Sequence, residues 1–195
     1  MKTSYKLEIE ALIKNEEFQK LATIGGQTPF HLEDNALVHT NMVAREAVGI
    51  FGQYSFMHLV ALLHDIGKIY TGRLKTDGVN WEYPHHSDGG AIVLQIWRSL
   101  GIITLSGEDY ILAKWLIFNH IQTLFMKGSR AECIENLKSR MQTLKGSGWF
   151  EDIMNVDVDQ HFDKLVWLGV CDITGSKSAQ SQDETIKKLQ TLLVK

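Results

Sequence analysis

The stretch that decides how this chain is organised is Leu59-Val60-Ala61-Leu62-Leu63-His64-Asp65-Ile66-Gly67-Lys68. Its apolar start predicts a buried helix, and Gly67 is typical of a helix C-terminus. His64 and Asp65 follow that apolar run, where an ionised carboxylate is costly to bury without a positive partner. A divalent metal ion would satisfy both side chains, whereas a plain His–Asp hydrogen bond at a helix end is the alternative interpretation.

Four more potential ligands lie beside apolar helical patterns elsewhere in the chain, namely His39, His86, His120 and Asp172. His39 by itself is also typical of a helix surface. His120 closes a strongly apolar helix, and Asp172 shares a helix face with Leu165 and Leu168. These positions favour a metal site over an isolated hydrogen bond at His64.

The composition describes a globular chain. The sequence has 195 residues, of which 44% are hydrophobic and 22% charged, and only two are prolines. This size suits one compact domain, expected over 1–195 with a core at about 30–178 and flanking helices at both ends. The net charge of -3 argues against an extensive nucleic-acid-binding surface. We expect no membrane span, because no apolar stretch approaches the required length, and no signal peptide, because the chain turns polar and acidic directly after Met1. Cys133 and Cys171 form no motif, which favours free thiols in a reducing cytoplasm.

Apolar spacing and capping residues predict a mostly helical chain. The expected helices cover 4–22, 33–49, 54–66, 86–100, 107–119, 129–144 and 158–173, and a last one follows a cap at 181–184. Residues 69–84 differ, because Asp77-Gly78 between two short extended runs predicts a hairpin. Trp81 and Tyr83 on that hairpin are expected either to pack within it or to cover a ligand base.

One segment of the chain, 114–145, is basic. Its cations are Lys114, Lys127, Arg130, Lys138, Arg140 and Lys145, against the two acids Glu132 and Glu135. A solvated helix face is the usual meaning of such a run. The alternative is a contact for the phosphates of a nucleotide or RNA end.

The spaced set of His39, His64-Asp65, His86, His120 and Asp172 resembles the HD-domain superfamily of metal-dependent phosphohydrolases, over about residues 30–178. The specific part is His64-Asp65-Ile66-Gly67-Lys68. The run from His86 to Ala91 is similar to a helix start of that family. The hairpin before it is similar to the HD domain of bacterial CCA-adding tRNA nucleotidyltransferases, whose polymerase half this chain lacks.

The resemblance implies an all-α helical bundle with a short β-hairpin insertion. It also implies one or two divalent ions. One would be held by His39, His64, Asp65 and Asp172, and the second by His86 and His120 with Asp65 bridging. His85 is an alternative to His86, and Asn119 stands where some subfamilies carry a further histidine. The ligand types suit Mn, Fe, Ni, Co or Zn, with Mg possible.

The implied activity is hydrolysis of a phosphoester in a nucleotide or RNA end by a metal-activated water, as a 2′,3′-cyclic phosphodiesterase, phosphatase or nucleotidase. Asp65 and Lys68 would be catalytic, and Lys68, Arg73 and His85 would contact the substrate. A di-iron oxygenase with the same ligands and a non-catalytic nucleotide-binding module are the alternatives. Lys68 argues against the first and the intact ligand set against the second. Both a monomer and a homodimer remain open.

Overall fold

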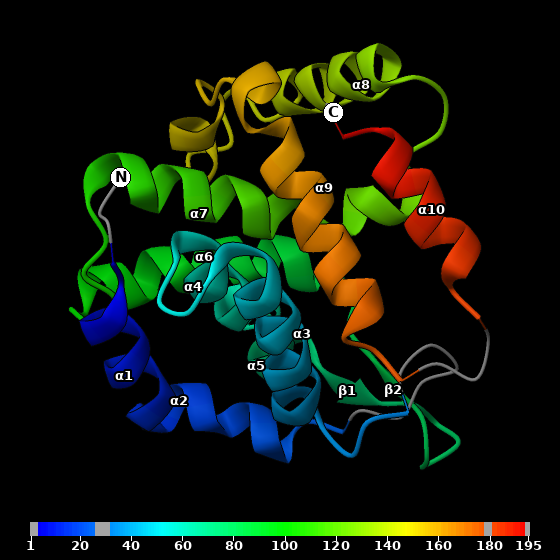
Figure 1. Ribbon diagram of the computed structural model, residues 1–195. Coiled ribbons are helices and arrows are strands. Elements are labelled where there is room, and N and C mark those ends of the chain that lie inside the picture. The colour runs from blue at the N-terminus through cyan, green and yellow to red at the C-terminus, as the bar shows by residue number, and fades with distance from the viewer. Residues whose placement is uncertain (1–3, 26–31, 178–180, 194–195) are drawn as a thin grey trace.

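A computed structural model describes residues 4–25, 32–177 and 181–193 of the chain. It confirms the predicted all-α fold with one short hairpin (Figure 1). The α-helices are α1 (Lys6–Lys14), α2 (Glu16–Gln19), α3 (Ala36–Phe51), α4 (Phe56–Leu63), α5 (Lys68–Thr71), α6 (His86–Ser99), α7 (Gly107–Asn119), α8 (Arg130–Gln142), α9 (Val158–Thr174) and α10 (Asp183–Thr191). Three 3₁₀ helices are η1 (Lys20–Thr23), η2 (His120–Phe125) and η3 (Glu151–Ile153). Strands β1 (Arg73–Leu74) and β2 (Trp81–Glu82) pair antiparallel, with Arg73 opposite Glu82.

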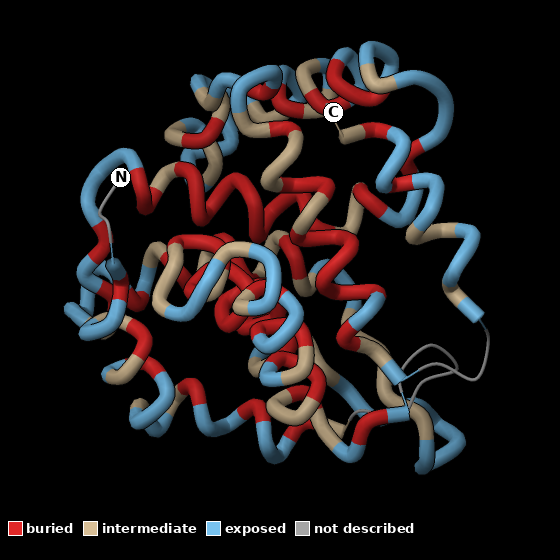
Figure 2. The backbone as a smooth tube through the Cα atoms, viewed as in Figure 1, coloured by how far each residue is buried: buried red, intermediate tan, exposed pale blue. Residues whose placement is uncertain are grey.

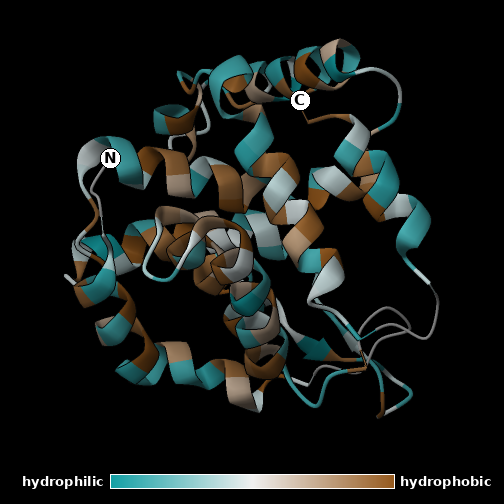
Figure 3. Ribbon diagram, viewed as in Figure 1, coloured by the Kyte–Doolittle hydropathy of each residue, from teal (hydrophilic) through white to brown (hydrophobic). Residues whose placement is uncertain are grey.

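Helix α4 lies at the centre of the core. Every residue of α4 except His58 is buried, and α3, α7 and α9 pack around it. Figures 2 and 3 show the buried and apolar residues concentrated on the facing sides of these helices. Each fully buried Leu or Val contributes about 1.5–3 kcal/mol. The chain that leaves α4 at His64 therefore emerges inside the protein, not at its surface.

The first predicted helix, 4–22, is interrupted. Asn15 adopts an extended backbone (ψ 130°), and its side chain accepts hydrogen bonds from the backbone N–H groups of Glu17 and Phe18. Asn15 therefore ends α1 and caps α2, because an Asn oxygen satisfies the free N–H groups of a helix start. The prediction of one continuous helix is wrong at this residue.

Gly67 is not a helix C-cap, so that prediction is also wrong. Helix α4 ends at Leu63, and Gly67 has right-handed helical dihedrals (φ -63°) before α5. A Cβ atom at Gly67 would lie 1.9 Å from the carbonyl oxygen of His86 and 2.4 Å from the backbone nitrogen of Gly90. Glycine is required here because the backbone of α6 crosses directly over it.

Helix caps agree with the sequence at one position and differ at two. Ser129 and Glu132 form the complete reciprocal capping box predicted for α8. Ser106 accepts from the backbone N–H of Asp109, but its hydroxyl donates to the Asp109 carboxylate, so the second half of the box is missing. Helix α10 has Gln182 at its N-cap position, without a side-chain cap.

None of the helices within residues 4–25, 32–177 and 181–193 is long and apolar enough to cross a membrane.

Candidate metal centre

Six side chains from separate elements meet at the inner end of α4. They are His39 of α3, His64 and Asp65 after α4, His86 at the start of α6, His120 at the start of η2 and Asp172 near the end of α9. His39, His64, Asp65 and His120 are at most 2% exposed. The structure thus brings together all six residues predicted as metal ligands.

Asp65 lies between two groups of histidines, one facing each of its carboxylate oxygens. Its Oδ2 is 3.4 Å from Nε2 of His39 and 3.3 Å from Nε2 of His64. Its Oδ1 is 3.5 Å from Nε2 of His86 and 3.8 Å from Nε2 of His120. A carboxylate in this position is suited to bridge two ions.

Asp172 completes the first group. Its Oδ1 is 3.0 Å from Nε2 of His39 and 3.6 Å from Nε2 of His64. We refer to His39, His64, Asp65 and Asp172 as the His39 half-site, and to Asp65, His86 and His120 as the His86 half-site. The two half-sites share only Asp65.

The Nδ1 atom of each histidine is held away from the centre. Backbone carbonyl oxygens lie 2.6 Å from Nδ1 of His64, 2.9 Å from Nδ1 of His86 and 2.6 Å from Nδ1 of His120. The acceptors belong to residues three positions earlier. Such contacts fix the tautomer with the proton on Nδ1 and leave Nε2 as the metal-binding atom.

His39 is oriented by side chains instead. Its Nδ1 lies 3.5 Å from the hydroxyl oxygen of Ser176 and 3.6 Å from Oε1 of Glu33, which is buried and accepts the backbone N–H of Lys177 at 2.5 Å. Glu33 was not singled out from the sequence, because nothing in its local pattern indicates a contact with His39.

Unsatisfied polar atoms show that the centre fits a divalent cation. Among the described residues, no hydrogen bond reaches the buried Nε2 atoms of His64 and His120 or Oδ1 of Asp172. Two ligand atoms that each lie about 2.1 Å from one ion are about 3.0–3.5 Å apart, which is close to the separations in the His39 half-site. Two groups of ligand atoms can therefore each hold a metal ion: His39, His64 and Asp65 form one, and Asp65, His86 and His120 form the other.

Proton affinities in the His39 half-site are governed by its two carboxylates. Burial opposes protonation of His64, but the nearby Asp65 and Asp172 outweigh it and raise the pKa of His64 to about 10. The pKa of His39 is raised in the same way, against burial, by Asp172 and Glu33. Burial likewise opposes ionisation of Asp65 and Asp172, yet the charged neighbours hold the pKa of both carboxyls well below the usual range.

The His86 half-site has the opposite character. Burial, together with the neighbouring His86 and His64, lowers the pKa of His120 to about 3. Burial also lowers the pKa of His86, although Asp65 opposes the change. At neutral pH these two imidazoles are uncharged, as metal ligands must be.

Lys68 and Tyr83 cover one side of the centre. The Lys68 ammonium donates a 2.5 Å hydrogen bond to Oδ2 of Asp65 and lies 5.0 Å from the centroid of the Tyr83 ring. The Tyr83 ring also meets His86 edge to face, and its hydroxyl oxygen is buried without a partner. Trp81 stacks on Tyr83 at 6.5 Å, and its indole occupies the space next to Gly25. The hairpin therefore contributes both internal packing and part of the wall of the centre.

The structure does not bring Arg73 or His85 to the centre. The Arg73 guanidinium is 2.6 Å from Glu82 on the exposed hairpin. His85 has a left-handed backbone (φ 54°), and its side chain is 84% exposed with Nδ1 3.6 Å from Asp88. Of the adjacent pair, His86 is the residue that faces Asp65. The predicted substrate contacts of Arg73 and His85 are not supported by these positions.

Asn119 is also outside the ligand set. Its amide nitrogen donates to the backbone oxygen of Trp115.

Tyr83 was predicted only as hairpin packing or as a cover for a ligand base, yet its carbonyl oxygen accepts a hydrogen bond from Nδ1 of His86. Its position three residues before His86 was the sequence feature that could have indicated this contact.

Comparison of the chain with protein-family models, with curated proteins and with solved structures gives no match. The chemistry of the centre is therefore the ground on which a function is proposed.

Proposed function

We propose that this chain is a metal-dependent phosphohydrolase that cleaves a phosphoester of a nucleotide or RNA end. The observation that carries the proposal is the position of Asp65, whose two oxygens each face a pair of inward-pointing histidine Nε2 atoms. The resemblance of the His64–Lys68 motif to HD-domain phosphohydrolases supports it. When bound, Mn, Fe, Ni, Co, Zn or Mg would polarise a phosphoryl oxygen and acidify a coordinated water.

The side chains around the ligands suit a phosphate substrate. Lys68 adds a buried ammonium group to a centre with two carboxylates, and its positive charge favours the negative charge that grows on a phosphate during hydrolysis. Burial and the Asp65 carboxylate raise the pKa of Tyr83, so its phenol stays protonated and able to donate a hydrogen bond. The ring of Tyr83 excludes water from the Lys68–Asp65 pair.

The test is metal analysis of the purified chain beside a screen for phosphate release. Generic phosphatase substrates, nucleoside monophosphates and 2′,3′-cyclic nucleotides are assayed with added Mn, Ni, Co or Mg. We expect hydrolysis that a chelator removes and metal restores. Bound iron with oxygen consumption and no phosphate release would instead favour the di-iron oxygenase. Nucleotide binding by the metal-loaded chain without any turnover would favour the binding module.

Lys68→Ala tests the assignment of Lys68. We expect a loss of rate larger than the loss of bound metal, because a protonated lysine is not a metal ligand and the proposal assigns Lys68 to the substrate phosphate. Arg73→Ala is the matched control, since Arg73 pairs with Glu82 away from the centre and its removal should change neither quantity. An equal fall in rate and metal content for Lys68→Ala would make Lys68 a structural residue.

A further inference from the structure

The fold divides the basic segment 114–145 into two kinds of cation. Three of the six are paired with acids of the chain: Lys114 with Asp152, Arg130 with Asp163, and Lys138, at the surface, with Glu135 and Asp159. The Lys114 ammonium is fully buried and also donates to the carbonyl oxygen of Trp149. The pairs formed by these three cations account for their positions in the fold. Lys145 is exposed, which leaves Lys127 and Arg140 to be explained.

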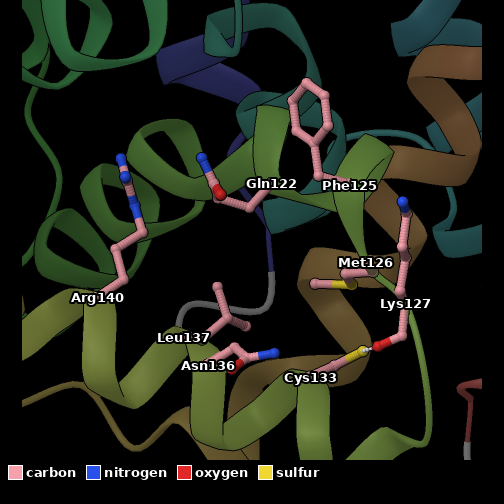
Figure 4. A pocket seen from close by; sticks show the side chains of 8 residues that line it. All are labelled: Gln122, Phe125, Met126, Lys127, Cys133, Asn136, Leu137 and Arg140. Carbon is pink, nitrogen blue, oxygen red and sulfur yellow. Dashed lines mark hydrogen bonds between the residues drawn. The ribbon is translucent and has the colours of Figure 1, made fainter.

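Lys127 and Arg140 line the same pocket, which has a volume of about 160 Å³. Figure 4 shows the pocket between η2 and α8, with Gln122 on η2 and Asn136, Leu137 and Arg140 on α8. Leu137 and Met126 form an apolar floor. Polar donors therefore surround a small apolar base.

The fold engages only part of the polar groups of this pocket among the described residues: the Arg140 guanidinium pairs with Asp88 and lies 4.6 Å from the centroid of the Phe118 ring. Within residues 4–25, 32–177 and 181–193, no side-chain hydrogen bond or ion pair engages the Lys127 ammonium or the amides of Gln122 and Asn136. Nε of Arg140 is buried without a partner. The nearest acid to Arg140 is Asp88, at 3.7 Å from Nη2. The Lys127 ammonium and two amide groups are thus available to a ligand rich in acceptor oxygens, with the Arg140 guanidinium, already paired with Asp88, beside them.

The pocket adjoins the His86 half-site through two elements. Gln122 follows His120 by two residues in η2, a rise of about 4 Å along a 3₁₀ helix. On the other side, Arg140 reaches Asp88, which follows His86 by two residues in α6. The two elements that carry Gln122 and the acid paired with Arg140 thus also carry His120 and His86, the two histidines of this half-site.

We propose that this pocket binds a second phosphate of the nucleotide substrate, distinct from the phosphate whose ester is cleaved. Lysine, guanidinium and amide N–H donors match the acceptor oxygens of a phosphate and offer it no competing negative charge within the lining. The inference rests on the proposed function for its substrate. The second phosphate has two possible sources: the other phosphate of a nucleoside bisphosphate, or the phosphodiester of the neighbouring nucleotide in an RNA end.

The test is a binding titration of the metal-free chain, which separates the pocket from turnover. Adenosine 3′,5′-bisphosphate is compared with adenosine 3′-monophosphate by calorimetry at constant ionic strength. We expect the bisphosphate to bind about tenfold more tightly, the effect of one charge-assisted contact. Lys127→Ala should remove that preference, whereas Lys145→Ala, which deletes an exposed lysine of the same segment outside the pocket, should keep it.

Equal binding of the two nucleotides, or a preference that survives both in Lys127→Ala and in Gln122→Ala, would overturn the proposal. A dinucleotide ending in a 3′-phosphate identifies the source. Tighter binding of the dinucleotide assigns the phosphodiester, and tighter binding of the bisphosphate assigns the second phosphate of one nucleoside. A chain that prefers two phosphates but hydrolyses no ester keeps the pocket and loses the proposed function. A hydrolase without the preference loses only the pocket.

Discussion

The two half-sites share one carboxylate, but the pKa of a histidine is raised in one and lowered in the other. In the His39 half-site, Asp65 and Asp172 face two histidines, and the pKa of His64 rises to about 10. In the His86 half-site, two histidines share one oxygen of Asp65, and the pKa of His120 falls to about 3. The number of carboxylates per histidine explains the difference, because both half-sites are buried.

The half-site with more negative charge to attract a cation is therefore not the half-site whose histidines are already deprotonated. The His39 half-site offers more negative charge to a cation, but its histidines must first release protons. The His86 half-site has neutral imidazoles at pH 7 and less charge to attract the ion. We therefore expect the His39 half-site to hold its ion more tightly, with an affinity that rises with pH.

Asp65→Ala breaks both half-sites at once and should have the largest effect. Removing the shared carboxylate should abolish turnover and reduce bound metal, by more than the roughly hundredfold loss that changes outside the ligand shell cause at most. Metal analysis, activity and circular dichroism measure the three consequences. Asp159→Ala, which removes an exposed acid of α9, is the control. Retained activity in Asp65→Ala would rule out the metal site as assigned.

His120→Ala breaks only the His86 half-site. We expect one of two bound ions to be lost, with the helical signal and the other ion retained, because Nε2 of His120 faces Oδ1 of Asp65, whereas Nε2 of His39 and of His64 face Oδ2. Asp172→Ala is the counterpart that should weaken the tighter half-site. Identical metal loss in the two variants would show that the half-sites do not act separately.

Glu33→Gln tests whether a side chain outside the ligand set orients His39 in its half-site. Carbonyl groups that no substitution can remove hold Nδ1 of His64, His86 and His120, whereas His39 is held by side chains. We expect metal affinity to fall about 10- to 100-fold, the range for partners outside the ligand shell. Glu135→Gln on the exposed face of α8 is the control. An unchanged affinity would mean that Glu33 does not position His39.

The stability of the metal-free chain should depend on pH in opposite directions on the two sides of neutrality. Folded His64 keeps a proton that the unfolded chain releases above its ordinary pKa of 6.5, so this stabilisation is complete below pH 6.5 and is lost as the pH rises toward 10. His120 stays unprotonated in the folded chain at pH values where it binds a proton in the unfolded chain. The free energy of unfolding therefore falls as the pH drops from 6.5 toward 3.

Urea denaturation at pH 5, 6.5 and 9 measures both slopes. The window from pH 5 to 6.5 lies above the range in which Asp65 and Asp172 take up protons, so it reports on the histidines. His120→Ala should flatten the acid slope and leave the alkaline slope in place. A free energy of unfolding that is constant over the three pH values would contradict the protonation states of both half-sites.

Local sequence determined the helical character of the chain and the identity of the ligand types. Apolar spacing at helical period predicts burial of one face whatever the neighbours are, so α3, α6, α7 and α9 begin and end within a few residues of their predicted bounds. The short run from His64 to Lys68 also predicted a metal-binding cluster, and the structure brings His64 and Asp65 together with the other predicted ligands. The break at Asn15 was missed although Asn before Glu16 and Glu17 is a local helix-start pattern, because the apolar spacing continues across it.

Only the tertiary structure decided which of several residues of the same type reach the metal centre or the pocket. His85 and His86 are the same side chain at adjacent positions, and the left-handed backbone of His85 alone turns it to solvent. Six cations in one segment look alike in sequence, yet acids 21 to 38 residues away pair with Lys114, Arg130 and Lys138, while Lys127 and Arg140 line a pocket. Gly67 was misread because the backbone that crosses it belongs to α6. Contacts between distant segments depend on how helices pack, and no local pattern records that packing.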